Sequence, residues 1–422
     1  MDKIVINGGK KLEGEISISG SKNAALPIIV GALLSGGKSR LENIPRLKDI
    51  DTIIEVIRYL GAKADFIDKH TLEIDGKNLD KELAPYNLVK TMRASFLVIA
   101  PLLARLGKAK VSLPGGCAIG ARPVNFHIKG LKQLGVDIEV EEGYVIAKTS
   151  GLQGAKIYLD FPSVGATENL IIAACLAEGE TIIENAACEP EVEDLINFLS
   201  LMGAKIEGVG KNVIHIQGVD KLNPVNYKII SDRIETGTFM IAAGITKGRI
   251  KINNAVPEHN EALEKKLLEA GMDITKGKDY FLVKGDGILK AVDIKTMPYP
   301  GFPTDMQAQM MALMTVTPGK SLVNETVFEN RFMHVSELNR MGAKIEINGH
   351  QAIVEGVPYL SGAPVLASDL RASGALILAG LVAKGRTEIK RVYHLDRGYE
   401  NIENKFSQLG AEIRREKDMD LF

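Results

Sequence analysis

The sequence predicts an α/β protein built from similar modules, three in each of two domains, because two markers recur in phase along its 422 residues. Six apolar, helix-like segments each end in a glycine, and these glycines recur every 66 to 72 residues: Gly36, Gly107, Gly179, Gly248, Gly319 and Gly385. A second glycine, in strings such as YLGA and RMGA, follows each of them after 23 to 28 residues: Gly61, Gly135, Gly203, Gly271, Gly342 and Gly410. The period is too long for common solenoid repeats, so globular domains are expected.

Each module reads as a helix, a strand, a second helix and a strand pair. The first helix, such as residues 22–36, is apolar nearly all round, so we expect it to be buried on several sides and to end on its glycine. A short β-run such as 181–186 follows, and then an amphipathic helix such as 260–272, whose charged face should lie outside. An alternating strand pair, such as 343–356, completes the module. Residues 1–21 have no helix before their strand, so this strand should close back on the C-terminal module.

The composition is that of a soluble globular protein, with 45% hydrophobic and 25% charged residues. Its 52 basic and 53 acidic side chains give a net charge of -1, which argues against nucleic acid or a membrane surface as a general partner. Neither a signal peptide nor a bilayer-length apolar run stands out, so a cytoplasmic protein is expected. Cys117, Cys175 and Cys188 are too scattered for a disulfide framework, and the histidines and cysteines lack the paired spacing of a metal site.

Polar and charged residues stand at the start of each apolar helix. They are Lys22 and Asn23, Arg93, Ser163 to Gly165, Asp232 to Glu235, Asp305, and Asp369 to Arg371. Helix capping explains the serines, asparagine and aspartates. It does not explain the cations, which stand at the positive end of the helix dipole, so we expect an anion shared between several helix ends. A cleft between the two domains would bring these helix ends together.

The stretch LPGGCAIGARP, residues 113–123, places the thiol of Cys117 in a glycine-rich turn near Arg122. Positive charge and backbone N–H groups favour a thiolate, and a guanidinium fits a phosphate or carboxylate. The string YPGFPTD, residues 299–305, ends a rigid turn on the carboxylate of Asp305. These groups predict chemistry on a small, multiply charged anion, with an incidental cysteine on a surface loop as the alternative.

Seven strings carry a resemblance to a known family: LPGGCAIGARP, SGSKNAALP, FPSVGATEN, YPGFPTDMQAQ, FENRFMHVSEL, DLRASGALILAG and DRGYENIE. Spread over nearly the whole chain, they resemble the UDP-N-acetylglucosamine 1-carboxyvinyltransferases, also known as UDP-N-acetylglucosamine enolpyruvyl transferases. The resemblance implies the fold of the EPSP synthase-like superfamily, a two-domain inside-out α/β barrel of six βαβαββ modules. Residues 22–229 would form the first domain, and residues 1–21 with 230–422 would form the second.

The resemblance also implies a transferase that works without a cofactor. It would move the enolpyruvyl group of phosphoenolpyruvate onto the 3-hydroxyl of UDP-N-acetylglucosamine, through a tetrahedral intermediate, and release phosphate. This reaction is the first committed step of peptidoglycan and hence cell-wall synthesis. The two small molecules are the implied partners, with neither nucleic acid nor membrane, and the oligomeric state is left open.

The implied roles fall on residues that match the family motifs. Cys117 would be the general acid, would form a covalent phosphoenolpyruvate adduct and would be alkylated by fosfomycin, while Asp305 would be the base at the 3-hydroxyl. Lys22 and Arg397 would join the catalytic set. Phosphoenolpyruvate would be bound by Lys22, Asn23, Arg122, Asp369, Arg371 and Arg397. The sugar nucleotide would be lined by Arg93, Arg122, Pro123, Val124, Asn125, Phe126, Ser163, Val164, Gly165, Asp305, Val327 and Arg331.

One departure and two alternatives accompany the resemblance. Many family members carry Asp-Leu where this chain has Asn125 and Phe126, which removes a carboxylate on the nucleotide side. A 3-phosphoshikimate 1-carboxyvinyltransferase would share the fold, but Cys117 and FPSVGATEN disfavour it. A non-catalytic nucleotide-sugar-binding regulatory paralogue is the alternative of another class, and turnover would separate it from an enzyme.

Overall fold

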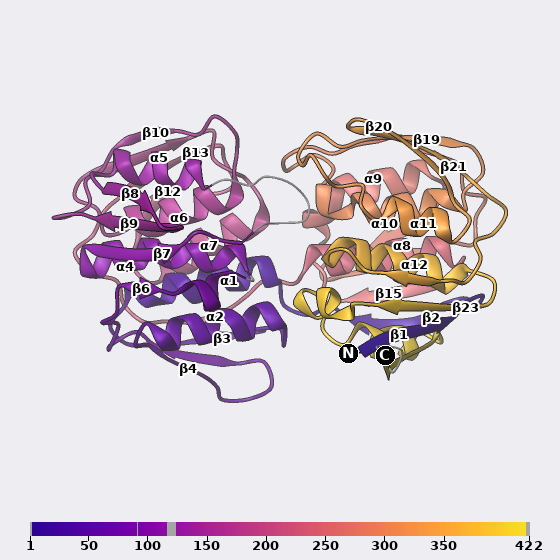
Figure 1. Ribbon diagram of the computed structural model, residues 1–422, viewed down its shortest axis with the longest axis horizontal. Coiled ribbons are helices and arrows are strands. Elements are labelled where there is room, and N and C mark those ends of the chain that lie inside the picture. Colours follow the sequence, from indigo (N-terminus) through magenta and orange to yellow (C-terminus); the bar gives the residue numbers. More distant parts are fainter. Residues whose placement is uncertain (1, 91, 116–123, 419–422) are drawn as a thin grey trace. The chain divides into compact units, whose positions relative to one another are not determined.

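The computed structural model describes residues 2–90, 92–115 and 124–418, which form two compact units (Figure 1). Of the described residues, those between 20 and 230 form one unit, and residues 2–19 with residues 231–418 form the other. Across these described ranges, no helix is long and apolar enough to cross a bilayer, and no group of three or more histidine, cysteine or acidic side chains could hold a metal ion.

The unit of residues 20–230 contains three four-stranded sheets. Its α- and 3₁₀ (η) helices are α1 (Lys22–Gly31), η1 (Ala32–Leu34), α2 (Lys48–Tyr59), α3 (Tyr86–Val89), η2 (Arg93–Val98), α4 (Ile99–Leu106), α5 (Asn125–Gln133), α6 (Val164–Ala174) and α7 (Pro190–Leu201). Its strands are β3 (Lys38–Glu42), β4 (Lys63–Phe66), β5 (Leu72–Asp75), β6 (Leu83–Ala84), β7 (Lys108–Ser112), β8 (Asp137–Glu141), β9 (Tyr144–Lys148), β10 (Lys156–Tyr158), β11 (Glu180–Glu184), β12 (Lys205–Glu207), β13 (Val213–Gln217) and β14 (Asn226–Lys228).

The unit of residues 2–19 and 231–418 contains the other three sheets. Its helices are α8 (Arg233–Ile245), η3 (Pro257–Asn260), α9 (Glu261–Glu269), η4 (Thr304–Met306), α10 (Gln307–Thr315), α11 (Val335–Arg340), α12 (Leu370–Val382), η5 (Val392–Arg397) and α13 (Ile402–Gln408). Its strands are β1 (Asp2–Asn7), β2 (Glu13–Ser17), β15 (Arg249–Asn253), β16 (Asp273–Lys276), β17 (Tyr280–Lys284), β18 (Ile294–Lys295), β19 (Lys320–Asn324), β20 (Lys344–Asn348), β21 (Gln351–Glu355), β22 (Pro364–Leu366), β23 (Arg386–Lys390) and β24 (Glu412–Lys417).

The six sheets repeat one pattern, which confirms the predicted modules. In the sheet of order β10-β11-β13-β12, β10 pairs parallel with β11, and the other pairs are antiparallel. The chain there runs β10-α6-β11-α7-β12-β13, a βαβαββ module. The remaining sheets have the orders β14-β3-β5-β4, β6-β7-β9-β8, β16-β17-β15-β2, β18-β19-β21-β20 and β22-β23-β1-β24. Strand β1 lies between β23 and β24, with Ile4 opposite Ile389 and Arg415, so the leading strand closes on the C-terminal module as predicted.

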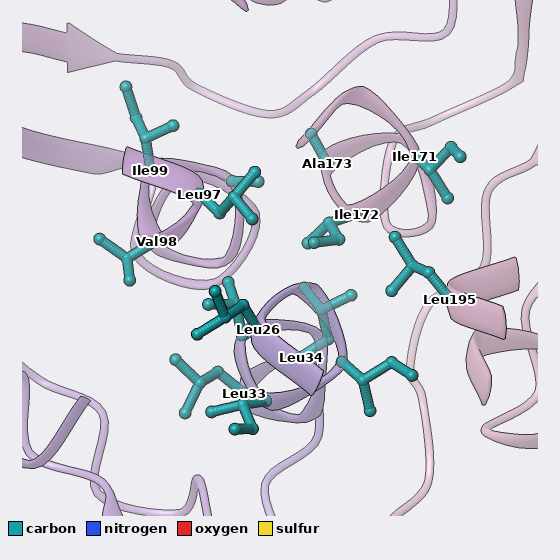
Figure 2. Close-up of a cluster of buried hydrophobic side chains, with 14 of the residues drawn as sticks. Leu26, Leu33, Leu34, Leu97, Val98, Ile99, Ile171, Ile172, Ala173 and Leu195 are labelled. Carbon is teal, nitrogen blue, oxygen red and sulfur yellow. The ribbon is translucent and has the colours of Figure 1, made fainter. Parts of the chain in front are cut away.

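The first helices of the modules form the cores. Figure 2 shows Leu26 of α1, Leu97 of η2 and Ile172 of α6 in one buried cluster. In the other unit, α8, α10 and α12 pack against one another in the same way. Burial of each such leucine or isoleucine stabilises the fold by about 1.5–3 kcal/mol relative to exposure. The helices that start with polar residues are therefore fixed along their whole length by apolar packing.

The two glycine markers serve different purposes. All six glycines of the second marker have positive φ, such as 106° at Gly61 and 94° at Gly410, where other residues would be strained. In the first marker, Gly107 ends α4 directly with φ 69°, as predicted. The prediction is wrong for the other five segments, whose helices end before the glycine. Their last helical residues are Leu34 of η1, Ala174 of α6, Ile245 of α8, Thr315 of α10 and Val382 of α12. Gly248 is required by a close approach instead, because a Cβ there would lie 2.2 Å from the backbone oxygen of Leu12.

Candidate active site

A carboxylate between two buried arginines is the centre of the candidate site in the unit of residues 231–418. Asp305 lies in η4, directly after the turn that ends at Pro303. Arg331 donates a hydrogen bond to its Oδ1 and Arg371 donates one to its Oδ2, each at 2.7 Å. The arginine side chains are only 4% and 6% exposed, whereas that of Asp305 is 28% exposed. The carboxylate is therefore more accessible to a ligand than either guanidinium.

The electrostatics of this cluster favour an anionic ligand. Burial by itself would raise the pKa of the Asp305 carboxyl, but the charges and hydrogen bonds of Arg371 and Arg331 outweigh it. The pKa of Asp305 therefore lies well below its usual range, and the group is a carboxylate at physiological pH. Two guanidinium groups against one carboxylate leave a net positive charge, which suits a phosphate or a second carboxylate.

Asp369 positions Arg371 through the start of α12. Its Oδ1 accepts hydrogen bonds from the backbone N–H groups of Arg371 at 2.8 Å and Ala372 at 3.1 Å, so it is the N-cap of the helix. Arg397 is in η5, and its charge reaches the same region. Burial lowers the pKa of His394, Arg397 lowers it further and Asp369 opposes the change, so both charges lie close to that ring. The structure thus gathers four predicted residues, Asp305, Arg331, Asp369 and Arg371, with Arg397 nearby.

Sequence reasoning missed Glu325, which links two parts of this site. It is 1% exposed and accepts hydrogen bonds from the hydroxyl groups of Thr296 at 2.8 Å and Thr304 at 2.9 Å. It also accepts from the backbone N–H groups of Val327 at 2.9 Å and Phe328 at 3.2 Å. Thr304 directly precedes Asp305, so the carboxylate of Glu325 holds both the turn that carries Asp305 and the loop of Val327. Its position just before the FENRFMHVSEL string was the available signal.

Lys22 and Asn23 begin α1 in the other unit. Ser21 is the N-cap and its Oγ accepts from the backbone N–H of Ala24 at 3.3 Å. Lys22 Nζ donates to Oδ2 of Asp49 at 3.1 Å, and the two side chains are 11% and 5% exposed. Asp49 stands in the first turn of α2 and was not singled out by any sequence pattern. This carboxylate explains how a lysine is held at the positive end of a helix dipole.

Three of the segments assigned to the sugar nucleotide meet at His127. The ring of His127 is 5.3 Å from that of Phe96, in the 3₁₀ helix that begins at Arg93. Its Nδ1 lies 2.9 Å from Nδ2 of Asn169 in α6. A Cβ at Gly165 would lie in ordinary contact with its Cε1, at 3.5 Å, so the start of α6 lies against the ring. The chain therefore brings together Arg93, the segment after Val124, and Ser163 to Gly165.

Helix capping accounts for several of the polar helix starts. Ser163, Asp232 and Asp369 are N-caps whose side chains accept backbone hydrogen bonds. Asp305 does not cap a helix through its side chain, because η4 has Pro303 as its N-cap. Cys117, Arg122 and Pro123 lie outside the described residues.

A family model described as EPSP synthase (3-phosphoshikimate 1-carboxyvinyltransferase) matches residues 6–406. The chain is 57% identical over 415 residues to a protein named UDP-N-acetylglucosamine 1-carboxyvinyltransferase from Desulfosudis oleivorans, covering 98% of this chain and 99% of the relative. It is 56% identical over 424 residues to UDP-N-acetylglucosamine 1-carboxyvinyltransferase 2 of Carboxydothermus hydrogenoformans, covering 99% of this chain and 100% of that one.

Solved structures show the same fold. The enolpyruvyl transferase NikO from Streptomyces tendae superposes with a TM-score of 0.88 at 25% identity, covering 98% of each chain. An EPSP synthase from Acinetobacter baumannii superposes with a TM-score of 0.77 at 17% identity, covering 99% of this chain and 100% of that one.

Proposed function

We infer that this protein is an enolpyruvyl transferase, because the chain belongs to the UDP-N-acetylglucosamine 1-carboxyvinyltransferases within the EPSP synthase family. It transfers the enolpyruvyl group of phosphoenolpyruvate to the 3-hydroxyl of UDP-N-acetylglucosamine and releases phosphate, the first committed step of peptidoglycan synthesis. The observation that carries the site assignment is Asp305 between Arg331 and Arg371, an accessible carboxylate in a cationic setting. A shikimate substrate is less well supported, since the EPSP synthase structure is only 17% identical.

The proposed chemistry needs an acid, a base and fixed positive charge. The thiol of Cys117 would protonate the methylene carbon of phosphoenolpyruvate as the 3-hydroxyl oxygen adds to its C2, and the hydroxyl proton would pass to Asp305. The Cys117 thiolate would then take a proton back from the same methyl carbon as phosphate leaves, which restores the double bond. Lys22, Arg122 and Arg397 would stabilise the phosphate as its negative charge develops. Addition of the thiol to phosphoenolpyruvate would give the covalent adduct.

The hydrogen bonds of Asp305 set a condition on its role as a base. Each of its oxygens accepts from an arginine, so proton uptake is unfavourable while both partners stay in place. In this state the carboxylate orients the 3-hydroxyl rather than deprotonating it. If Arg371 turns to the carboxylate or phosphate of phosphoenolpyruvate, the pKa of Asp305 rises and the proton can transfer. Binding of one substrate would thereby activate the base for the other.

The sugar nucleotide would bind along the segments that meet at His127. Arg93 would supply positive charge, Ser163 to Gly165 would offer backbone groups at the start of α6, and Val124, Asn125 and Phe126 would line the base and ribose. Arg122 and Pro123 would extend this surface, and Val327 and Arg331 are the remaining residues assigned to the sugar nucleotide. Asn23 and Asp369 would position the intermediate.

The direct test is phosphate release by the purified chain with phosphoenolpyruvate and each candidate acceptor. UDP-N-acetylglucosamine should support turnover and shikimate 3-phosphate should not. Tight binding of UDP-N-acetylglucosamine without any phosphate release would favour the non-catalytic paralogue.

A further inference from the structure

Two adjoining hollows border α9 in the unit of residues 231–418. The smaller has a volume of about 170 Å³ and lies at the start of the helix, where Arg233, Asn260 and Tyr299 line it. The larger has a volume of about 540 Å³ and lies between α9 and strands β18 and β19. Ala262 and Lys265 line both, so the two hollows adjoin at α9. No residue assigned to the reaction lines either of them.

Asn260 marks the smaller hollow as a ligand site. It is the N-cap of α9, yet its side chain makes no capping hydrogen bond. The residue is only 6% exposed, and its Nδ2 has no hydrogen-bond partner among the residues that the structure describes. Buried amide donors nearly always have a partner, because leaving one without an acceptor is costly. An oxygen atom of a ligand in the hollow would supply that acceptor.

The surroundings of Asn260 favour an anion. Arg233 lines the same hollow, with its guanidinium carbon 5.7 Å from the ring centre of Tyr299. The first turn of α9 adds N–H groups without intrahelical partners at the positive end of the helix dipole. Basic side chains outnumber acidic ones around the two hollows, with Arg233, Lys265, Lys266 and Lys295 against Glu261 and Asp293.

The larger hollow lies where the second helix of one module faces the first strand of the next. At several of the corresponding places the helix packs on the strand, as α5 does with β10, α11 with β22 and α13 with β2. Tyr227 of β14 likewise donates to Asp194 of α7 at 2.7 Å. Between α9 and β18 the corresponding place is open, with Ile294, Phe302 and Leu322 among its lining residues. This apolar surface lies directly beside the cationic hollow.

We propose that the two hollows form a binding site for a small anionic ligand with an apolar part. Its phosphate or carboxylate accepts hydrogen bonds from Asn260 Nδ2 and Arg233, and its apolar part lies against Phe302 and Leu322. None of the residues assigned to phosphoenolpyruvate or the sugar nucleotide lines the site, although Pro303 in its lining lies two residues before Asp305.

Calorimetric titration of the full chain with phenyl phosphate tests this site, because the probe joins an anionic group to an apolar ring. The Arg397→Gln variant serves as background, since it weakens binding of the probe at the residues assigned to phosphoenolpyruvate. In that background we expect saturable binding, weakened about tenfold or more by Arg233→Gln or by Asn260→Asp, which places a negative charge against the anion. Arg340→Gln, an exposed arginine of α11, is the matched control and should bind the probe normally. Sodium benzoate in a parallel titration distinguishes carboxylate from phosphate recognition.

Three results would overturn the proposal. These are loss of all probe binding in Arg397→Gln alone, unchanged binding in both Arg233→Gln and Asn260→Asp, or no saturable binding of either probe. The thermal midpoint of each variant shows that it is folded. Asn260→Asp keeps the size of the side chain and its Oδ1 atom, so it remains informative even if Arg233→Gln fails to fold.

Discussion

Arg371 and Asp305 are 66 residues apart in the chain, yet the guanidinium donates a 2.7 Å hydrogen bond to the carboxylate. Arg371, which is assigned to phosphoenolpyruvate, therefore holds Asp305, which is assigned as the base. We therefore expect substrate binding and proton transfer to be linked through the side chain of Arg371.

Arg371→Gln should raise the pKa of Asp305, because it removes a positive charge while the burial that disfavours the carboxylate remains. The acid limb of the pH profile of kcat/KM should move to higher pH, in addition to any loss of affinity for phosphoenolpyruvate. Arg386→Gln, an arginine exposed on β23, is the control. An acid limb at the same pH in both variants would show that Arg371 does not set the basicity of Asp305.

Asp305→Asn should lower both turnover and stability. Loss of an acid–base group costs at least about 10² in rate, and the two buried arginines lose a charged partner, which costs about 1–3 kcal/mol in free energy of unfolding. The folded pKa of Asp305 is below its ordinary value of 3.8, so the stabilisation is present above that pH and is lost as the pH falls below it. Denaturant unfolding at pH 7 and at successively lower pH measures this. A difference from the parent that grows on acidification would contradict the assignment.

Glu325→Gln should disturb the site without touching a substrate. The amide oxygen can still accept from Thr296, Val327 and Phe328, and the amide nitrogen can donate to the Thr304 hydroxyl, which then has to accept instead. The hydrogen bonds lose their charged acceptor, at a cost of about 1–3 kcal/mol in stability. We expect kcat to fall with it, because Thr304 and Val327 lose their common anchor. Glu355→Gln, which alters an exposed carboxylate on β21, is the matched control and should leave both quantities unchanged. A loss of stability with normal kcat would reduce Glu325 to a purely structural residue.

Asp49→Asn should release Lys22 from its fixed position. The variant keeps the size of the side chain but removes the charge that faces Nζ at 3.1 Å. Misplacement of a cation at the phosphate should reduce kcat/KM for phosphoenolpyruvate by about tenfold or more. Asp160→Asn alters an exposed ion pair with Lys129 in the same unit and is the control. Equal kcat/KM values for phosphoenolpyruvate in the two variants would show that Asp49 does not position Lys22 for the reaction.

Cys117→Ser should depress turnover far more than substrate binding, and the variant should resist alkylation by fosfomycin. Steady-state kinetics, equilibrium binding of UDP-N-acetylglucosamine and mass spectrometry after fosfomycin treatment measure the three effects. Equal losses of turnover and binding would indicate that the loop only supports the structure.

The repeat could be predicted from the sequence because each glycine of the second marker meets a local requirement of the backbone. Gly61 and Gly410 both end an outer helix with positive φ, and this requirement is visible in the residue type. The partners of the site residues have no such local signal. Asp49 pairs with Lys22, and Arg331 and Arg371 pair with Asp305, only because distant modules pack together. Glu325 was missed for the same reason, since its hydrogen bonds join residues that strand pairing brings into reach.

We infer above all that this chain transfers an enolpyruvyl group to UDP-N-acetylglucosamine. The most direct measurement follows phosphate release and the product's vinyl protons by nuclear magnetic resonance, with phosphoenolpyruvate and UDP-N-acetylglucosamine as substrates. We expect the parent chain to release one phosphate for each 3-O-enolpyruvyl product, and the Cys117→Ser variant to form no product on the same timescale. Binding of both substrates with neither phosphate nor vinyl ether formed by the parent chain would contradict it.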